Sequence, residues 1–342
     1  RMDLNCHFAL AAAQQAVDQA GLTEGNFDPY RTGVIYGSGV GGLAVAEEEI
    51  PKLNAKGPGR VSPLCIPEMI ANMAAAYISM RFGFKGENFC PVSACATANH
   101  SIGEAMRAIR HGYQDIVLCG GTENGIIPIA LAGFSNMKAL HTGDDPACAS
   151  IPFDARRSGF VMGEGAGCLV LESLTHAQAR GATILAEVAG YGASGDAYHI
   201  TSPAPEGDAA ARAIRGAIED AGLTPADVDY INAHGTSTPL NEKYETIAIK
   251  KAFGDAAYKV KVSSTKSMTG HLLGGAAAVE AIACVMAIRE GIIPPTIGYQ
   301  EPDPECDLDI TPNKAVEMPV NVAISNSLGF GGHNACILFK KV

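Results

Sequence analysis

The stretch CPVSACATANHSIGEAMRAI, residues 90–109, is the one from which the fold of this chain can be worked out. It carries two cysteines, Cys90 and Cys95, then very small residues, and it ends in a helical pattern. It therefore predicts a strand that turns into a helix, with Cys95 in the first helical turn. There the helix dipole and free N–H groups favour thiolate over thiol, and the N–H groups suit a developing oxyanion. A buried structural cysteine is the alternative, because free cysteines are commonly buried.

Length and composition predict a globular chain with two domains. The 342 residues fit two domains of roughly 150–170 residues each. Hydrophobic residues make up 47% and charged residues 18%, which is typical of a well-packed core. No uncharged apolar run is long enough for a membrane span, and the opening segment has the pattern of an amphipathic helix, not of a signal peptide.

Cysteine spacing and charge narrow the possible environment and partners. The ten cysteines are scattered without a CxxC pair, so a reducing cytoplasm is the expected location. A net charge of −11 argues against nucleic acid as a partner. The same charge would repel an acidic protein, unless basic residues gather locally on the surface.

Strand and helix patterns alternate along the chain, which predicts an α/β protein with parallel sheets covered by helices. The expected strands are 32–39, 115–123, 166–173, 228–232 and 320–332, and the clearest helices are 66–83, 208–223 and 274–291.

A weak internal repeat suggests two related halves. AAQQAVDQAGL (12–22) and RAIRGAIEDAGL (212–223) each have a helical pattern that ends in AGL, and a strand follows each of them. The boundary between the halves is expected near residues 174–184.

Two histidines lie in polar contexts next to predicted elements. NAHGTSTP places His234 just after a strand, and STKSMTGHLLGG places His271 before a long helix, with Lys266 five residues earlier. Such positions commonly carry the chemistry of α/β proteins. The alternatives are a satisfied loop histidine and a helix-capping histidine. No metal is expected, because the spacing does not fit a short ligand pair.

The glycine-rich GSGVGG (37–42) invites comparison with a dinucleotide-binding loop. It lacks the G-x-G-x-x-G spacing and an acidic residue about twenty positions further on, so it is a weak indication of such a site.

Taken together, five blocks resemble the elongating β-ketoacyl-acyl-carrier-protein synthases, and they occur in that family's order. They are SACATANHSIGEA, PFDARRSGFVMGEGAG, NAHGTSTP, STKSMTGHLLGGAAAVEA and SNSLGFGGHNA. The likeness runs from near residue 1 to residue 342, and the form of GFGGHNACILFK and GSGVGG is more similar to the type II synthases than to type I.

The resemblance implies an α/β thiolase fold with two pseudo-repeated halves in a five-layer αβαβα sandwich, usually as a homodimer. We expect residues 1–178 to form the half with the nucleophilic cysteine and residues 179–342 the half with the two histidines. The family also has a glycine-rich first strand ahead of the segment that opens this sequence, and we expect that strand to be absent here.

The resemblance also implies catalytic roles. Cys95 would take the acyl chain as a thioester, and His234 and His271 would stabilise the enolate formed when the malonyl group loses CO2. Lys266 would organise the charge around the second histidine, and Glu280 would anchor Lys266 through an ion pair. Initiating synthases have Cys-His-Asn at these positions and thiolases have Cys-His-Cys.

Further positions match substrate-contacting residues of the family. Phe330 would contribute an oxyanion-hole N–H with Cys95 and would gate the site, since Gly331 and Gly332 beside it permit backbone movement. The remaining matches are Thr236, Thr238 and Thr201 along the pantetheine arm and Val40 in the acyl pocket.

The expected partner is acyl carrier protein, as acyl-carrier and malonyl-carrier, and no cofactor is expected because decarboxylation drives the reaction. Arg60 and Lys138 match the family's carrier-docking positions, and Arg1 is a further candidate for the same basic patch. The implied activity is an acyltransferase: a type II β-ketoacyl synthase that extends fatty acids by two carbons. The alternatives are a type I synthase, a polyketide-type ketosynthase and, much less favoured by the intact Cys95, a non-catalytic chain-length factor.

Overall fold

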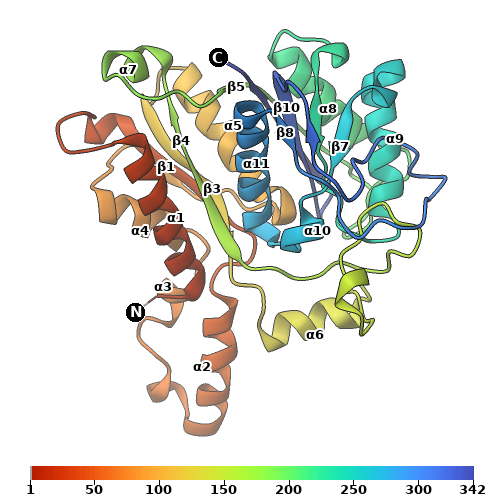
Figure 1. Cartoon of the computed structure of the whole chain (residues 1–342). Helices are drawn as coiled ribbons and strands as arrows, with labels where there is room; N and C mark the ends of the chain where they lie inside the picture. The colour runs from red at the N-terminus through yellow and green to blue at the C-terminus, as the bar shows by residue number, and fades with distance from the viewer. Residues whose placement is uncertain (1) are drawn as a thin grey trace. The chain divides into compact units, whose positions relative to one another are not determined.

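The structure is a computed structural model that describes residues 2–342 (Figure 1). By its internal contacts the chain divides into two compact units. Unit 1 comprises Arg1–Gly133, Glu164–Thr183 and Leu272–Ala278, and unit 2 comprises Phe134–Gly163, Ile184–His271 and Val279–Val342. The two family halves 1–178 and 179–342 stay a prediction.

Unit 1 contains a four-stranded sheet in the order β2-β1-β3-β4. β1 is parallel to β2 and to β3, whereas β4 is antiparallel to β3. β1 and β3 are buried along their whole length, as expected of apolar strands covered on both faces. Their bounds are β1 Thr32–Ser38, β2 Asn88–Phe89, β3 Ile116–Glu123 and β4 Gly165–Glu172.

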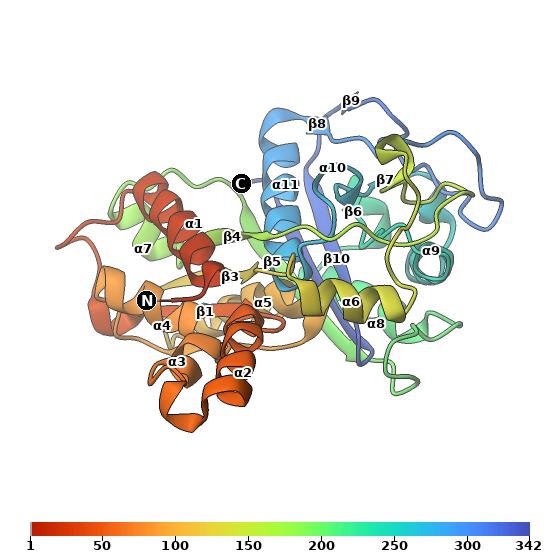
Figure 2. The ribbon, with the colours of Figure 1, turned by 90° about the horizontal axis from the view of Figure 1, so that it is seen from below.

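Helices cover both faces of this sheet (Figure 2). Val34 and Tyr36 of β1 pack in one hydrophobic cluster with small residues of α1 and α4. Gly37, which points to the opposite face, lies so close to Thr97 of α5 that a Cβ there would be 2.1 Å from its methyl group. The helices that lie in unit 1, wholly or in part, are α1 Leu4–Ala20, α2 Leu43–Lys56, α3 Cys65–Met69, α4 Met73–Phe82, α5 Thr97–Arg110, α6 Pro128–Asn136 and α7 Leu174–Ala179.

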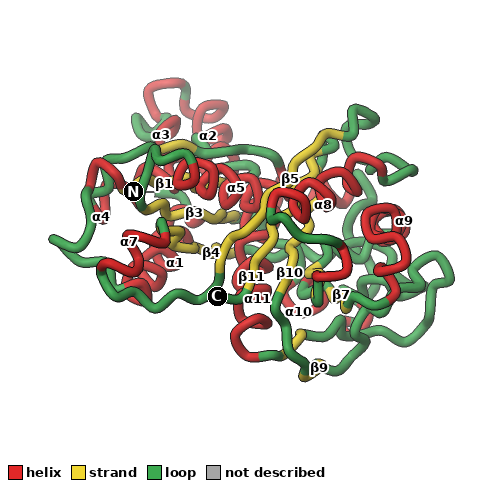
Figure 3. The backbone as a smooth tube through the Cα atoms, turned by 90° about the horizontal axis from the view of Figure 1, so that it is seen from above, coloured by secondary structure: helices red, strands yellow, loops and turns green. Residues whose placement is uncertain are grey.

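Unit 2 contains a five-stranded sheet in the order β5-β11-β10-β6-β7. β5, β11 and β10 are its long strands, which lie side by side in Figure 3. They run antiparallel, whereas β6 and β7 continue the sheet in parallel. The bounds are β5 Glu187–Gly195, β6 Tyr230–Asn232, β7 Lys261–Ser263, β10 Val322–Gly329 and β11 His333–Lys340; a separate ribbon pairs β8 Ile292–Ile293 with β9 Val316–Glu317.

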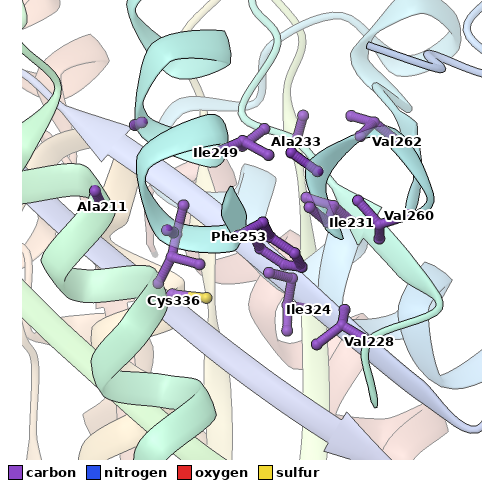
Figure 4. Packing of buried hydrophobic residues seen from close by; sticks show 14 of the residues in the cluster. Ala211, Val228, Ile231, Ala233, Ile249, Phe253, Val260, Val262, Ile324 and Cys336 are labelled. Atoms are coloured by element: carbon purple, nitrogen blue, oxygen red, sulfur yellow. The ribbon is translucent and has the colours of Figure 1, made fainter. Parts of the chain in front are cut away.

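The core of unit 2 lies between this sheet and two helices. Ile231 of β6 and Ile324 of β10 pack against Ala211 of α8 and against Ile249 and Phe253 of α9 (Figure 4). The helices of this part of the chain are α8 Asp208–Asp220, α9 Asn241–Phe253, α10 Lys266–Thr269 and α11 Ala276–Glu290.

Two sequence expectations need correction. The sheets are mixed and not purely parallel, because β4, β5 and β11 pair antiparallel with their neighbours. The helix expected over 66–83 is two helices, because Ile70 adopts an extended conformation with ψ 139° and ends α3 at Met69. Over residues 2–342, every helix is too short or too polar to cross a bilayer.

The internal repeat has a structural counterpart in each sheet. Reading outward from the parallel edge, β2-β1-β3-β4 and β7-β6-β10-β11 have the same order and the same strand directions. The AGL sequences put Gly21 and Gly222 in the left-handed region, with φ 65° and 68°, where α1 and α8 end. A short 3-10 turn precedes α5 and another precedes α11, at Ala94–Ala96 and Leu273–Gly275.

Candidate active site

Cys95 lies half-buried at the centre of the 3-10 turn Ala94–Ala96 in unit 1. The thiol therefore stands in the turn that leads into α5 and not inside the helix, which begins at Thr97. The residue before it, Ala94, has φ 50°, a strained value for a residue with a Cβ. Such a bend presents the following side chain at the end of the helix.

Two side chains hold this turn from within unit 1. The Ser93 N–H donates to Thr97 Oγ1 at 2.9 Å, and Ser93 Oγ lies 2.7 Å from His100 Nδ1. Both contacts join the turn to α5, so the position of Cys95 is fixed locally by its own sequence block.

His234 follows β6 in unit 2, and a buried carboxylate fixes its backbone. The N–H groups of His234 and Gly235 donate to the two oxygens of Glu245, at 2.7 and 2.9 Å. Asn326 Nδ2 donates to the same carboxylate at 2.8 Å. Glu245 was missed in the sequence, where it has the appearance of a surface residue of a charged helix; its spacing of four from Asn241, which also donates to it, was the available signal.

His271 lies beside His234, with ring centroids 5.4 Å apart and ring planes at 86°. Phe160 packs edge-on against the other side of the His271 ring at 5.4 Å. The segment around Phe160 also holds the His271 backbone, because its N–H donates to the Val161 carbonyl at 2.7 Å. The PFDARRSGFVMGEGAG block thus supports the second histidine, a role that the sequence alone did not indicate.

Lys266 is buried between the first histidine and an acidic residue of α11. Its Nζ donates to the His234 carbonyl at 2.7 Å, lies 3.5 Å from His234 Nδ1, and forms an ion pair with Glu280. An ammonium group can only donate, so its contact with Nδ1 leaves the proton of a neutral His234 on Nε2. Lys266 is 1% exposed and Glu280 2% exposed, so water does not screen their attraction.

Both imidazoles are held neutral. Burial, and then the nearby positive charge of Lys266, lowers the pKa of His234 and of His271 well below the ordinary value of 6.5. Burial raises the pKa of Glu280, and the Lys266 ammonium opposes that shift. Each neutral imidazole keeps one N–H, so the pair can offer two hydrogen-bond donors to an oxyanion.

This shift predicts that acidification destabilises the fold. In the unfolded chain these histidines take up protons near pH 6.5, whereas the folded chain does not, so the free energy of unfolding falls as the pH drops below about 6.5. Each histidine contributes a slope of up to about 1.4 kcal/mol per pH unit. Urea unfolding from about pH 7.5 to about pH 5.5 measures it.

Variants separate the contribution of the two histidines from that of buried carboxylates. The raised pKa values of those carboxylates make the free energy of unfolding rise as the pH falls, which is the opposite effect. His271→Asn is expected to have a shallower slope than the unmodified chain. His111→Asn, which changes an exposed histidine of unit 1, should keep the original slope. Equal slopes in His271→Asn and in the unmodified chain would contradict the assignment.

The loop after His234 carries the two predicted pantetheine-contacting hydroxyls. Thr236 and Thr238 lie side by side, with their Oγ1 atoms 3.0 Å apart. Buried Arg157 donates to the carbonyl of Thr238 and pairs with Asp303, at 3.0 and 2.6 Å.

A second buried acidic side chain fixes the same loop. The N–H of Ser237, a residue with φ 72°, donates to Glu242, and burial raises the pKa of Glu242 to about 7. Glu242 and Arg157, which belongs to the PFDARRSGFVMGEGAG block, thus both hold this loop.

Phe330 lies in the β10–β11 hairpin, between Gly329 and two glycines with positive φ. The N–H of Gly331 donates to the Ile200 carbonyl at 2.8 Å, which joins the hairpin to the loop that contains Thr201. Gly332 has φ 74°, a conformation that glycine adopts without strain. Phe330, Gly331, Gly332 and Thr201 thus belong to two connected loops of unit 2.

The remaining predicted residues lie on exposed or half-exposed surface. Val40 is 48% exposed in the loop after β1, and Arg60 and Lys138 are exposed, one in each unit. Arg1 lies outside the described residues. Unit 2 therefore brings together His234, His271, Lys266 and Glu280, whereas Cys95, Val40 and Arg60 belong to unit 1.

Comparison with known proteins identifies relatives along the whole chain. The chain is 54% identical over 342 residues to 3-oxoacyl-[acyl-carrier-protein] synthase 2 of Synechocystis sp., covering 100% of this chain and 82% of that protein. It is 52% identical over 341 residues to the protein of the same name from Staphylococcus aureus strain N315, with the same coverage.

Solved structures give the same result. A β-ketoacyl synthase from Burkholderia phymatum STM815 matches with a TM-score of 0.94 and 35% identity, over 100% of this chain and 83% of that one. A ketosynthase structure described as a type II PKS acyl-carrier protein in complex with its ketosynthase matches with a TM-score of 0.96 and 36% identity, over 99% and 85% of the two chains. The ishigamide ketosynthase/chain length factor matches with a TM-score of 0.92 and 41% identity, over 100% and 83%.

These neighbours are thiolase-fold ketosynthases, so the predicted fold class is confirmed. The family model "Beta-ketoacyl synthase, N-terminal domain" matches residues 1–177, and "Beta-ketoacyl synthase, C-terminal domain" matches residues 185–300. The two matches include Cys95 in the first domain and His234, Lys266 and His271 in the second, and the chain therefore belongs to the β-ketoacyl synthase family.

Proposed function

We propose that this protein is a 3-oxoacyl-[acyl-carrier-protein] synthase of type II, a condensing acyltransferase that extends an acyl chain by two carbons. The relatives with 52–54% identity carry that name. The observation that carries the proposal is the buried group formed by His234, His271 and Lys266, since two neutral imidazoles side by side suit an enolate oxygen.

In the first half of the reaction the Cys95 thiolate attacks the carbonyl carbon of an acyl-carrier thioester. A new C–S bond forms to Cys95, the C–S bond to the carrier breaks, and the carrier leaves as a thiol after taking up a proton. The backbone N–H groups of Cys95 and Phe330 are the proposed donors to the tetrahedral oxyanion. The strained turn at Ala94 and its contacts with α5 support the role of Cys95.

In the second half malonyl-carrier binds and loses CO2. The electron pair of the broken C–C bond forms an enolate, whose oxygen accepts hydrogen bonds from His234 and His271. The enolate carbon then attacks the acyl-Cys95 carbonyl, a C–C bond forms, and the Cys95 thiolate is released. The reaction as proposed uses no cofactor, because the loss of CO2 drives it, and we place it in the cytoplasm.

Lys266 has two parts in this proposal. Its contact with Nδ1 of His234 directs the imidazole N–H outward on Nε2, and its positive charge adds to the larger effect of burial in lowering the pKa of both rings. The Glu280 carboxylate fixes Lys266 in turn. Phe330 and its glycines are proposed as the gate, Thr236, Thr238 and Thr201 as contacts of the pantetheine arm, and Val40 as a wall of the acyl pocket.

A polyketide-type ketosynthase is the second candidate, because the solved ketosynthase described as part of a type II PKS matches at 36% identity. It shares the chemistry and differs in the acyl substrate.

The experiment that tests the proposal is intact-protein mass spectrometry after mixing with acyl-carrier, followed by peptide mapping. A single acyl adduct on the peptide with Cys95, and a 3-oxoacyl product extended by two carbons on addition of malonyl-carrier, support a synthase.

Carrier docking on exposed basic residues belongs to the same proposal. Because the chain has a net charge of −11, an acidic carrier needs local positive charge. Lys138→Glu is expected to raise the KM for acyl-carrier about tenfold and to change kcat little, and the effect should weaken at high salt. Steady-state kinetics measure it, with Lys259→Glu as the control at another exposed lysine of unit 2. An equal KM in both variants would exclude Lys138 from docking.

A homodimer is also proposed, and the edge of the unit 1 sheet supports it. β2 is the edge strand; Phe89 at its end and Val92 in the loop that follows it expose 42% and 56% of their surface. Exposed apolar strand edges favour association. Sedimentation velocity should give a dimer for the unmodified chain and for Tyr113→Asp, and a shift to monomer for Phe89→Asp. A dimer of undiminished stability in Phe89→Asp would place the interface elsewhere.

A further inference from the structure

The glycine-rich loop GSGVGG, a weak indication of a dinucleotide site in the sequence, wraps around a carboxylate of the protein itself. Glu123, the last residue of β3, points into the loop after β1. Its Oε2 accepts from the N–H of Gly39 at 2.8 Å, and its Oε1 accepts from Ser38 Oγ at 2.8 Å and from the N–H of Val40 at 3.3 Å. Successive backbone N–H groups of this kind form an anion-binding nest.

The same carboxylate also reaches the 3-10 turn Leu273–Gly275 of unit 1. The N–H of Gly274 donates to Oε2 of Glu123 at 3.0 Å. Gly274 is the central residue of its turn, as Cys95 is of the other, and the residues before them have nearly equal strained angles, φ 50° at Ala94 and φ 49° at Leu273. The backbone N–H of Gly274 therefore corresponds, in the repeated turn, to the backbone N–H of Cys95. It already has an anion as its partner, the carboxylate of Glu123.

The carboxylate is buried, and two glycines pack closely against it. Glu123 is 1% exposed. A Cβ added to Gly39 or to Gly274 would lie 2.7 Å from Oε2, so both residues must be glycines for the loop and the turn to close on it. Burial raises the pKa of Glu123, and the hydrogen bonds from Ser38, Gly274, Gly39 and Val40 oppose that shift.

We propose that Glu123 is a positioning residue that sets the acyl-chain specificity of the enzyme through Val40. Its carboxylate holds the backbone of Ser38, Gly39 and Val40 in one place, and Gly41 is held through Ser38 Oγ, which accepts its N–H at 2.9 Å. The position of the Val40 side chain therefore depends on this carboxylate. The inference rests on the proposed function, in which Val40 is a wall of the acyl pocket.

Glu123→Gln is the first test. An amide has one acceptor oxygen, so in either orientation its NH2 group would face a backbone N–H, either that of Val40 or those of Gly39 and Gly274, and the loop must move. We expect the ratio of kcat/KM between hexadecanoyl- and octanoyl-carrier to change by at least about 10-fold. The kcat with the better substrate should stay within about threefold of the unmodified enzyme, because the substitution replaces none of the proposed catalytic side chains.

The matched control is Glu49→Gln. Glu49 is likewise a buried carboxylate of unit 1, and it accepts from Lys52 and from the Ser62 N–H at 2.6 and 2.8 Å. It should lower stability without changing the chain-length ratio. If Glu123→Gln lowers kcat/KM equally for both chain lengths, Glu123 is merely structural and the inference is overturned.

Formate rescue gives an independent readout. Glu123→Ala leaves room for a small carboxylate beside the same N–H groups, so added sodium formate should restore the chain-length ratio of the unmodified enzyme, and sodium chloride at equal ionic strength should restore it less. A ratio that formate does not move would overturn the inference. If Glu123→Gln does not fold, Glu123→Ala with formate carries the test. A Glu123→Ala protein that folds only when formate is present also requires an anion at this site.

Val40→Phe separates this inference from the proposed function. It should reduce the use of hexadecanoyl-carrier relative to octanoyl-carrier in an otherwise active enzyme. If Val40→Phe changes the ratio and the Glu123 variants do not, only the role of Glu123 fails. If Val40→Phe leaves the ratio unchanged, the pocket assignment within the proposed function fails and the Glu123 inference fails with it.

Discussion

Replacement of Cys95 by alanine is expected to abolish acyl-enzyme formation and to reduce condensation by at least about 10³-fold, a minimum typical of the loss of a nucleophile. The acyl chain has no other covalent site in the proposed reaction, so the loss should be complete at the level of the adduct. Because Cys95 is half-buried in a turn fixed by Ser93 and Thr97, the substitution should change the stability little. Intact-protein mass after incubation with acyl-carrier measures the adduct.

Cys90→Ala is the matched control, since Cys90 lies five residues earlier in the same stretch. Burial raises the pKa of the Cys90 thiol, which makes it a poor nucleophile. This variant should keep acylation within about threefold of the unmodified enzyme. An adduct that persists in a folded Cys95→Ala protein, or that disappears in Cys90→Ala, would show that the nucleophile was assigned to the wrong cysteine.

The sequence was informative wherever the chemistry lies in one continuous block. SACATANHSIGEA predicted a turn into a helix at Cys95 because small residues, a strand and a helical period follow one another directly. The pattern was less reliable at the exact boundary. The strained φ of Ala94 places the thiol in a separate 3-10 turn, and no local propensity indicates that geometry.

Contacts between segments that lie far apart in the sequence could not be predicted from local sequence patterns. Lys266 meets His234 because β6 and β7 are parallel neighbours, with Asn232 opposite Ser263, and this register is a property of the sheet. Glu123 and Glu245 were missed for a related reason. An acidic residue in a strand or helix indicates solvent exposure unless backbone N–H groups surround it, and those donors come from other segments. The mixed sheets were missed for two reasons. The β10–β11 pair depends on hairpin closure at Gly331, and the antiparallel pairs β3–β4 and β5–β11 join segments that lie far apart in the sequence.

Lys266→Met is expected to cost about 3–5 kcal/mol of the free energy of unfolding, because it leaves the Glu280 carboxylate buried without its partner. Condensation should fall about 10²–10³-fold in addition, since His234 loses the contact that keeps its proton on Nε2. Acylation of Cys95 should continue, because Lys266 acts on the histidines of the second half-reaction. Urea unfolding measures the stability, and intact mass and product formation separate the two half-reactions.

The double variant Lys266→Met/Glu280→Leu distinguishes the two effects. Replacing both members of a buried ion pair by apolar side chains of similar size is often nearly neutral, so most of the lost stability should return. Condensation should stay low, because the imidazole N–H is still not directed outward. If condensation recovered together with stability, Lys266 would serve the fold alone. If acylation of Cys95 failed together with condensation in a stable double variant, the assignment of Lys266 to the second half-reaction would be wrong.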